Sequence, residues 1–193
     1  MSIKDYIFSL RKLFLFSFFI FLFSIIFGFF LAKSFPDIIL QTLSALKAVY
    51  SQVALLDSFS QFLFVLFNNS FVLFLILLFS FFFGIFPFLV LFSNGVVLGA
   101  LIYLLKGSLP ISLFLASILP HGIFEIPVLI VGSAAGFKIA NKTIKILFKK
   151  EQGLRKEIFS AFKFFLTVLI PFLVLAALIE IYFVPILLDK LSK

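Results

Sequence analysis

The sequence contains no cysteine and no tryptophan, it has one histidine, and only 12% of its residues are charged. The absence of cysteine excludes disulfides and thiolate metal sites. A single histidine excludes the paired-histidine motif of zinc hydrolases. The scarcity of charge excludes an ordinary soluble domain, in which about a quarter of the residues are charged.

Hydrophobic residues, by contrast, make up 64% of the 193 positions, and 34 of them are Phe. A soluble fold of this size cannot hide so much apolar surface. Helices of about 20 apolar residues are stable in a bilayer, because they satisfy their own backbone hydrogen bonds there. The sequence therefore predicts an all-α integral membrane protein with a single membrane domain over residues 1–193. It has no Walker loop and no nucleophile elbow, so we expect no enzymatic activity.

The basic residues are clustered, and they give the chain a formal net charge of +8. Three precede residue 13 (Lys4, Arg11 and Lys12), and eight lie between residues 138 and 163. Nucleic acid is not an expected partner, because its binding needs a solvated basic domain. Cytoplasmic loops carry an excess of Lys and Arg, so both clusters are expected on the cytoplasmic side of the plasma membrane. Anionic lipids are the expected partners of the basic segment 138–163.

Long hydrophobic runs predict the membrane spans. Three runs are each long enough to cross a hydrocarbon core of about 30 Å, at residues 13–32, 70–92 and 163–187. An even number of crossings must separate the two cytoplasmic clusters. Residues 94–106 and 120–137 are therefore expected to supply two more. The sequence predicts five membrane helices in all, with the N-terminus inside and the C-terminus outside.

The stretch at residues 37–67 is less hydrophobic than the spans. Its polar residues Gln41, Ser44, Lys47 and Ser51 recur near the helical repeat of about 3.6 residues, which predicts an amphipathic helix outside the membrane. Asp57 and Ser58 resemble a helix N-cap, which indicates two helices in this stretch.

Residues 109–137 would form a helix of about 43 Å, too long for one ordinary crossing. We therefore expect a broken or re-entrant helix near Pro110–Pro120, with the inward crossing beginning at Pro120. Pro suits the first turn of a helix, which supports a start at that residue.

Two pairs of glycines lie one helical turn apart, Gly95 with Gly99 and Gly132 with Gly136. Small residues at this spacing let helix backbones approach closely, so both pairs predict packing inside the bundle. The alternative is a face for a homo-oligomer. We interpret Asn94 and Gly95 as a turn after the second span. The other positions expected to serve packing or bending are Gly84, Pro120, Gly122, Pro127 and Pro185.

The polar residues inside apolar sequence are the main functional signal. His121 and Glu125 are four residues apart and share a helix face. A carboxylate at mid-membrane costs at least about 2.5 kcal/mol, so Glu125 is expected to be protonated, paired or in a wet cavity. Helix lengths place Asn69 and Glu180 in the same half of the membrane. The sequence predicts one polar intramembrane pocket formed by Asn69, His121, Glu125 and Glu180.

Two interpretations of this pocket remain open. The first is an interhelical staple, in which each hydrogen bond contributes about 0.6–2 kcal/mol. The second is a proton or cation site, because a histidine with a pKa near about 6.5 exchanges protons near neutral pH and can ligate a metal. His121, Glu125 and Glu180 are the candidate ligands of a divalent metal ion. Nothing in the sequence requires a cofactor.

The segment LPHGIFEIP occupies residues 119–127. Eleven further residues before and after it belong to the same pattern. They are Asn68, Asn69, Gly84, Asn94, Gly95, Gly99, Gly132, Gly136, Ile179, Glu180 and Pro185. Together they resemble the stage II sporulation protein M family over nearly the whole chain. Val184 stands where the family pattern has Thr, which removes a hydroxyl ligand and weakens the metal interpretation.

The resemblance implies a five-span fold and a scaffold function. The family's namesake in spore-forming bacteria is a membrane protein of the engulfment complex that holds two peptidoglycan-cleaving partners. Other membrane or cell-envelope proteins are therefore the implied partners. The alternative function, which rests on the buried ionisable residues, is a transporter or channel for a proton, a metal ion or a small solute.

Overall fold

The computed structural model describes residues 2–106, 111–149 and 151–191, without the side chains of residues 45–47, 49–50, 111–123, 149, 188 and 191. Within these ranges, five helices are long and apolar enough to cross a membrane. They are Ile3–Ser34, Ser58–Phe79, Ile85–Leu105, Phe124–Phe148 and Leu154–Leu187. The prediction of an all-α membrane protein with five spanning helices is confirmed.

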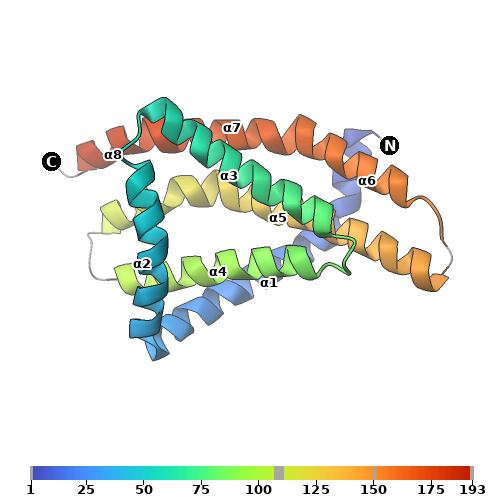
Figure 1. Cartoon of the computed structure of the whole chain (residues 1–193), viewed down its shortest axis with the longest axis horizontal. Coiled ribbons are helices and arrows are strands. Elements are labelled where there is room, and N and C mark those ends of the chain that lie inside the picture. The colour runs from blue at the N-terminus through green and yellow to red at the C-terminus, as the bar shows by residue number, and fades with distance from the viewer. Residues whose placement is uncertain (1, 107–110, 150, 192–193) are drawn as a thin grey trace.

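The spanning helices form a bundle in which successive members run in opposite directions (Figure 1). They are α1 (Ile3–Ser34), α3 (Ser58–Phe79), α4 (Ile85–Leu105), α5 (Ile111–Lys149) and a last span from α6 to α8. The start of α1, the α3–α4 turn and the α5–α6 connection lie at one end, which we call the N-terminal end. Helix α2 (Pro36–Val53) lies across the opposite, C-terminal end.

The last span is one continuous helical rod with two local changes of winding. It consists of α6 (Leu154–Phe164), the π-helix η1 (Phe165–Leu169), α7 (Ile170–Leu178), the π-helix η2 (Ile179–Phe183) and α8 (Val184–Leu191). Each π segment ends two residues before a proline, Pro171 or Pro185. Proline has no N–H and its ring clashes with the preceding turn, so the helix widens locally instead of keeping α geometry.

Helices α1 and α4 pack with their backbones in close contact. A Cβ atom on Gly99 would overlap the carbonyl oxygen of Ile25, and one on Gly95 would overlap the hydroxyl of Ser24. Gly28 of α1 would in turn overlap the backbone of α4. Only glycine permits this separation of the two helices. Gly95 and Gly99 therefore lie in the α1–α4 interface, and this face is covered within the chain.

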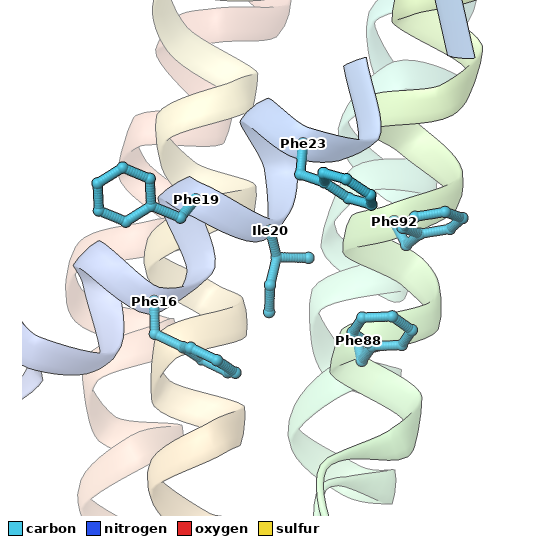
Figure 2. A pocket seen from close by; sticks show the side chains of 6 residues that line it. All are labelled: Phe16, Phe19, Ile20, Phe23, Phe88 and Phe92. Atoms are coloured by element: carbon cyan, nitrogen blue, oxygen red, sulfur yellow. The ribbon is translucent and has the colours of Figure 1, made fainter. Parts of the chain in front are cut away.

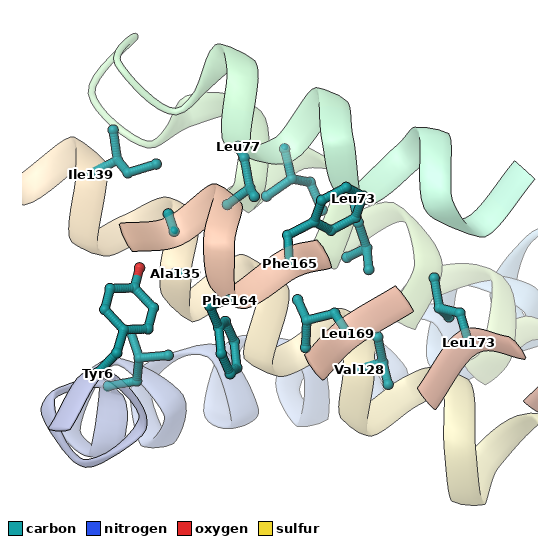
Figure 3. Packing of buried hydrophobic residues seen from close by; sticks show 13 residues of the cluster. Tyr6, Leu73, Leu77, Val128, Ala135, Ile139, Phe164, Phe165, Leu169 and Leu173 are labelled. Carbon is teal, nitrogen blue, oxygen red and sulfur yellow. The ribbon is translucent and has the colours of Figure 1, made fainter. Parts of the chain in front are cut away.

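The second glycine pair joins α5 to α3. A Cβ on Gly132 would lie 2.5 Å from Leu73 Cδ2, and one on Gly136 would lie 3.0 Å from Ile76 Cγ2. These contacts belong to a core shared by α3, α5 and the last span, in which Leu73 and Leu173 are both 2% exposed (Figure 3). Gly132 and Gly136 therefore lie where α5 packs against α3.

The expected turn at Asn94 and Gly95 is wrong, because both residues lie inside α4. The chain turns earlier, where Phe83 and Gly84 have positive φ angles of 53° and 77°. Glycine adopts this left-handed conformation without steric cost. The second crossing therefore spans Ser58–Phe79 rather than residues 70–92. The apolar run continues through the turn, so hydropathy alone does not mark it.

The stretch at residues 37–67 contains two helices, as its sequence indicates. Asp57 is the N-cap of α3, and its Oδ1 accepts hydrogen bonds from the amides of Phe59 and Ser60, both at 3.1 Å. The first of the two helices is α2. The second is not a separate surface helix, because it continues as the membrane crossing.

The expected break beside Pro120 is not found. Helix α5 continues from Ile111 to Lys149 through Pro120 and Pro127. Its 39 residues correspond to about 58 Å, so the excess length that suggested a break is instead accommodated by one long helix. Pro110 lies outside the described residues. The helix irregularities that are seen, η1 and η2, lie in the last span.

Candidate functional site

The residues of the predicted polar pocket lie on three elements that contact one another. Asn69 is half-buried on α3, Glu125 is buried on α5, and Glu180 is half-buried in η2. Both α3 and α5 contact η2. His121 belongs to α5, but its side chain lies outside the described part of the structure.

The register between α3 and α5 indicates how Asn69 and Glu125 are placed. The two helices run in the same direction (Figure 1). Gly136 faces Ile76 and Gly132 faces Leu73, so the difference in residue number between facing positions of the two helices is nearly constant. Continued toward the C-terminal end, this offset places Asn69 level with Val128. Asn69 and Glu125 are then about one helical turn apart along the bundle.

The register between α5 and α7 relates Glu125 to Glu180. These helices run in opposite directions, and a Cβ on Gly132 would lie 3.6 Å from Leu169 Cδ1. When equal numbers of residues are counted along both helices from this contact toward the C-terminal end, Ala176 lies opposite Glu125. Glu180 lies opposite the backbone of His121. By this register the four residues lie at similar levels along the bundle. That their side chains meet in one pocket stays a prediction.

The two carboxylates are enclosed. Glu125 is 6% exposed, and its Oε1 and the Oε2 of Glu180 have no contact with solvent. Neither carboxylate is without an interaction. Beside Asn69, the buried hydroxyl of Ser70 has no hydrogen-bond partner among the described residues. An enclosed carboxylate in a bilayer needs a proton or a compensating group, so this region can hold a proton or a cation.

The metal interpretation of the pocket remains untested. Among the side chains that the structure describes, no group of three His, Cys, Asp or Glu residues is placed to hold a metal ion. The side chain of His121 is not among those described. His121, Glu125 and Glu180 therefore stay candidate ligands by prediction alone.

The π-helical backbone around Glu180 was not predicted from the sequence. Glu180 is the second residue of η2. Single π turns within α-helices are frequent at functional sites. The signal that could have found this feature is the presence of Pro171 and Pro185 inside one apolar run, since each proline removes a backbone donor.

A second polar cluster, which the sequence also did not reveal, lies at the N-terminal end. Lys138 Nζ lies 2.9 Å from Glu157 Oε1 and donates a hydrogen bond to Ser9 Oγ at 2.8 Å. The same ammonium group lies 4.1 Å from the centroid of the Tyr6 ring. The side chains of Lys138 and Glu157 are only 17% and 16% exposed. The cluster ties α1, α5 and α6 together.

The basic segment 138–163 keeps an exposed cationic face. Its two acidic residues are both paired with lysines of the same segment, since Lys142 Nζ also lies 2.8 Å from Glu151 Oε2. Arg155, Lys156 and Lys163 are exposed on α6. The internal ion pairs therefore neutralise the acidic residues and leave these cations available to anions.

Two hollows of the described structure open on the outside of the bundle. One, of about 280 Å³, lies between α1 and α4 and is shown in Figure 2. It is lined by Phe16, Phe19, Ile20, Phe23, Phe88 and Phe92. The other, of about 380 Å³, is lined by Phe79, Phe82, Ile85, Phe86 and Leu89. All of these side chains are apolar, so both hollows suit acyl chains rather than ions.

Comparison with known proteins identifies the family. The model of the stage II sporulation protein M family matches residues 17–185. The chain is also 39% identical over 127 residues to an uncharacterised protein of Methanocaldococcus jannaschii, a match that covers 63% of this chain and 69% of that protein. No solved structure matches the chain. The family match reaches all five candidate spans, and the chain belongs to the stage II sporulation protein M family of membrane proteins.

Proposed function

We propose that this protein is a membrane scaffold that recruits a partner protein through α2. The observation that carries this proposal is the position of α2, which lies across the C-terminal end of the bundle and contacts α1 (Figure 1). Ile38 and Leu40 of α2 are 62% and 51% exposed, and Leu55 in the following turn is 87% exposed. An amphipathic helix with exposed apolar residues is a common docking element for other proteins.

The charge distribution supports an orientation in the plasma membrane. Lys4, Arg11 and the exposed cations of α6 all belong to the N-terminal end. The positive-inside rule places that end in the cytoplasm. Helix α2 and the C-terminus then face outward, where cell-envelope partners are accessible. Anionic lipid headgroups are the proposed partners of Arg155, Lys156 and Lys163, at about 1 kcal/mol per charge.

The close packing of the bundle favours a scaffold over a transporter. The α1–α4 and α3–α5 interfaces are closed by glycine contacts. A carrier needs a site that opens alternately to the two sides. Glu125 and the π-helical Glu180 support transport of a proton or cation as the second candidate function. We propose no enzymatic role, because the sequence has neither a Walker loop nor a nucleophile elbow.

Cross-linking tests the scaffold function. A photo-reactive amino acid is placed at Ile38 and, as the control, at Leu175, which is 52% exposed on α7. In native membranes we expect a discrete protein adduct from position 38 and only lipid adducts from position 175. Leu40→Lys should abolish the protein adduct. The same adducts from both positions would rule out recruitment through α2.

Flux measurements test the alternative function. The purified protein is reconstituted in liposomes with a pH-sensitive or metal-sensitive dye inside. If the protein is a scaffold, the wild type and the variants Glu125→Gln and Glu180→Gln should all give the same background flux. Proton or cation flux that both substitutions abolish would instead establish transport and overturn the proposal.

A further inference from the structure

The side chain of Asn94 lies on an exposed face halfway along a membrane helix. Helix α4 spans Ile85–Leu105, and Asn94 stands about 14 Å along its length of about 31 Å. The side chains of Asn94 and its neighbour Ser93 are both exposed. In the bilayer this depth is occupied by acyl chains, which offer no hydrogen bonds.

The polar atoms of Asn94 are only partly satisfied by its own helix. Its Nδ2 donates a hydrogen bond to the carbonyl of Val90 at 2.8 Å, and Ser93 Oγ donates to the same carbonyl at 3.1 Å. Within the described part of the chain, the Oδ1 atom of Asn94 accepts no hydrogen bond. One acceptor and one N–H of the carboxamide therefore point to whatever surrounds the bundle.

The internal packing of α4 uses a different face. Gly95 and Gly99 lie against α1, where they permit close contact of the two backbones. Asn94 takes no part in that interface, so the fold does not account for a polar group at this position. A polar group that faces lipid without a partner is costly, and a contact that satisfies it is favourable.

A second copy of the chain supplies the matching group. A carboxamide is both donor and acceptor, so two Asn94 side chains related by a twofold axis can bond each other reciprocally. One turn before Ser93, Leu89 lines the hollow of about 380 Å³ together with Ile85 and Phe82. This hollow offers space beside the seam for an apolar side chain of the other copy.

We propose that the protein forms a symmetric dimer through the face of α4 that carries Leu89, Ser93 and Asn94, with the two Asn94 side chains hydrogen-bonded across the axis. This interface differs from the glycine faces, which are covered within the chain. The dimer is independent of the scaffold function of α2. Each of the two proposals can fail without the other.

The absence of cysteine allows a direct test of contact. Ser93→Cys introduces the only thiol next to Asn94, and Leu166→Cys places one on a lipid-facing position that is 63% exposed. Upon oxidation in native membranes, Ser93→Cys should give a disulfide-linked dimer and Leu166→Cys should remain monomeric. Equal cross-linking of the two variants would overturn the proposal.

A dilution series tests the role of the carboxamide. Donor- and acceptor-labelled protein is reconstituted in liposomes at decreasing protein-to-lipid ratios, and energy transfer reports the dimer. Asn94→Leu should raise the dimer dissociation constant roughly tenfold. Asn141→Leu is the matched control, because Asn141 is exposed near the N-terminal end of the bundle.

Two outcomes of the dilution series would overturn the proposal. The first is a wild-type protein that is monomeric at every dilution. This result would also be expected if a different membrane protein, rather than a second copy, bound this face. The second is an Asn94→Leu variant with the same dimer dissociation constant as Asn141→Leu. Because Asn94 is exposed, Asn94→Leu should unfold at the wild-type temperature at dilutions where both proteins are monomeric, which distinguishes a lost interface from a lost fold.

Discussion

Helix α1 is held in two different ways along its length. Near its start, Ser9 and Tyr6 contact the ammonium group of Lys138, so the attachment depends on polar side chains. Farther along, Ser24 and Gly28 lie directly against the backbone of α4. Side chains of the first region can rotate and exchange partners, whereas backbone atoms in contact cannot. The first region should therefore tolerate paired substitutions and the second should tolerate none.

The largest effect is expected at the backbone contact. Gly99→Leu places a branched side chain where even a Cβ overlaps Ile25. The two helices must separate, and we expect a loss of roughly 4 kcal/mol or more in the free energy of unfolding. Unfolding in mixed detergent, followed by circular dichroism, measures this loss. Leu175→Ala on the exposed face of α7 is the control, since Leu175 is 52% exposed, and it should cost much less; similar losses for both would contradict the close contact.

Removal of the cation that contacts the start of α1, the ammonium group of Lys138 on α5, should have an intermediate effect. Lys138→Met leaves Glu157, whose side chain is 16% exposed, without its cation. We expect a loss of about 2–3 kcal/mol, and recovery of most of it in the double variant Lys138→Met/Glu157→Met. The same unfolding assay gives the coupling energy from a double-mutant cycle. A double variant as unstable as Lys138→Met would show that the ion pair does not carry the attachment.

Replacement of lysine by methionine at a more exposed ion pair should have a smaller effect. The side chains of Lys142 and Glu151 are 25% and 40% exposed, and water screens their interaction. Lys142→Met should therefore cost less than about 1 kcal/mol. The residue types of the two pairs are identical, so the comparison with Lys138→Met reports burial together with the contacts of Lys138 to Ser9 and Tyr6. Equal losses would mean that neither burial nor these contacts set the strength of the pairs.

The smallest effect is expected at the start of α3, away from both regions of α1. The hydroxyl of Ser60, followed by the backbone amides, lowers the pKa of Asp57 below its ordinary range. Because the folded pKa is the lower one, this stabilisation is present above the unfolded pKa and is lost as the pH falls through the folded pKa. Acidification should therefore raise hydrogen exchange at Phe59 and Ser60 after correction for the intrinsic rate. Asp57→Asn should abolish this pH dependence, and unchanged pH dependence would contradict the assignment.

The features that were predicted from the sequence are those with a local chemical signature. Apolar length gave the membrane class and three of the spans, and the positions of the Lys and Arg clusters gave the other two. The glycine spacing gave the close packing, since only small residues permit it. Asp57 marked the start of α3, because its carboxylate caps the amides that follow.

The features that were not predicted depend on contacts distant in sequence or on backbone geometry. Lys138 meets Ser9 across 129 residues, and no spacing rule joins them. The turn at Gly84 lies inside an apolar run, so hydropathy does not reveal it. Helix α5 passes Pro120 because a proline within a long helix need not end it. The four residues of the polar pocket were predicted from the sequence. The register of the helices supports only that these residues lie at a similar level along the bundle.

The two π segments of the last span also affect how relatives should be aligned. Each π turn contains one residue more than an α turn, so it rotates all later side chains by about 100° around the helix axis. A relative that lacks one residue within Phe165–Leu169 or Ile179–Phe183 would wind as an ordinary α-helix there and keep the same stripe of later residues toward the bundle. Single-residue gaps at these two places therefore mark loss of a π turn, rather than loss of the helix.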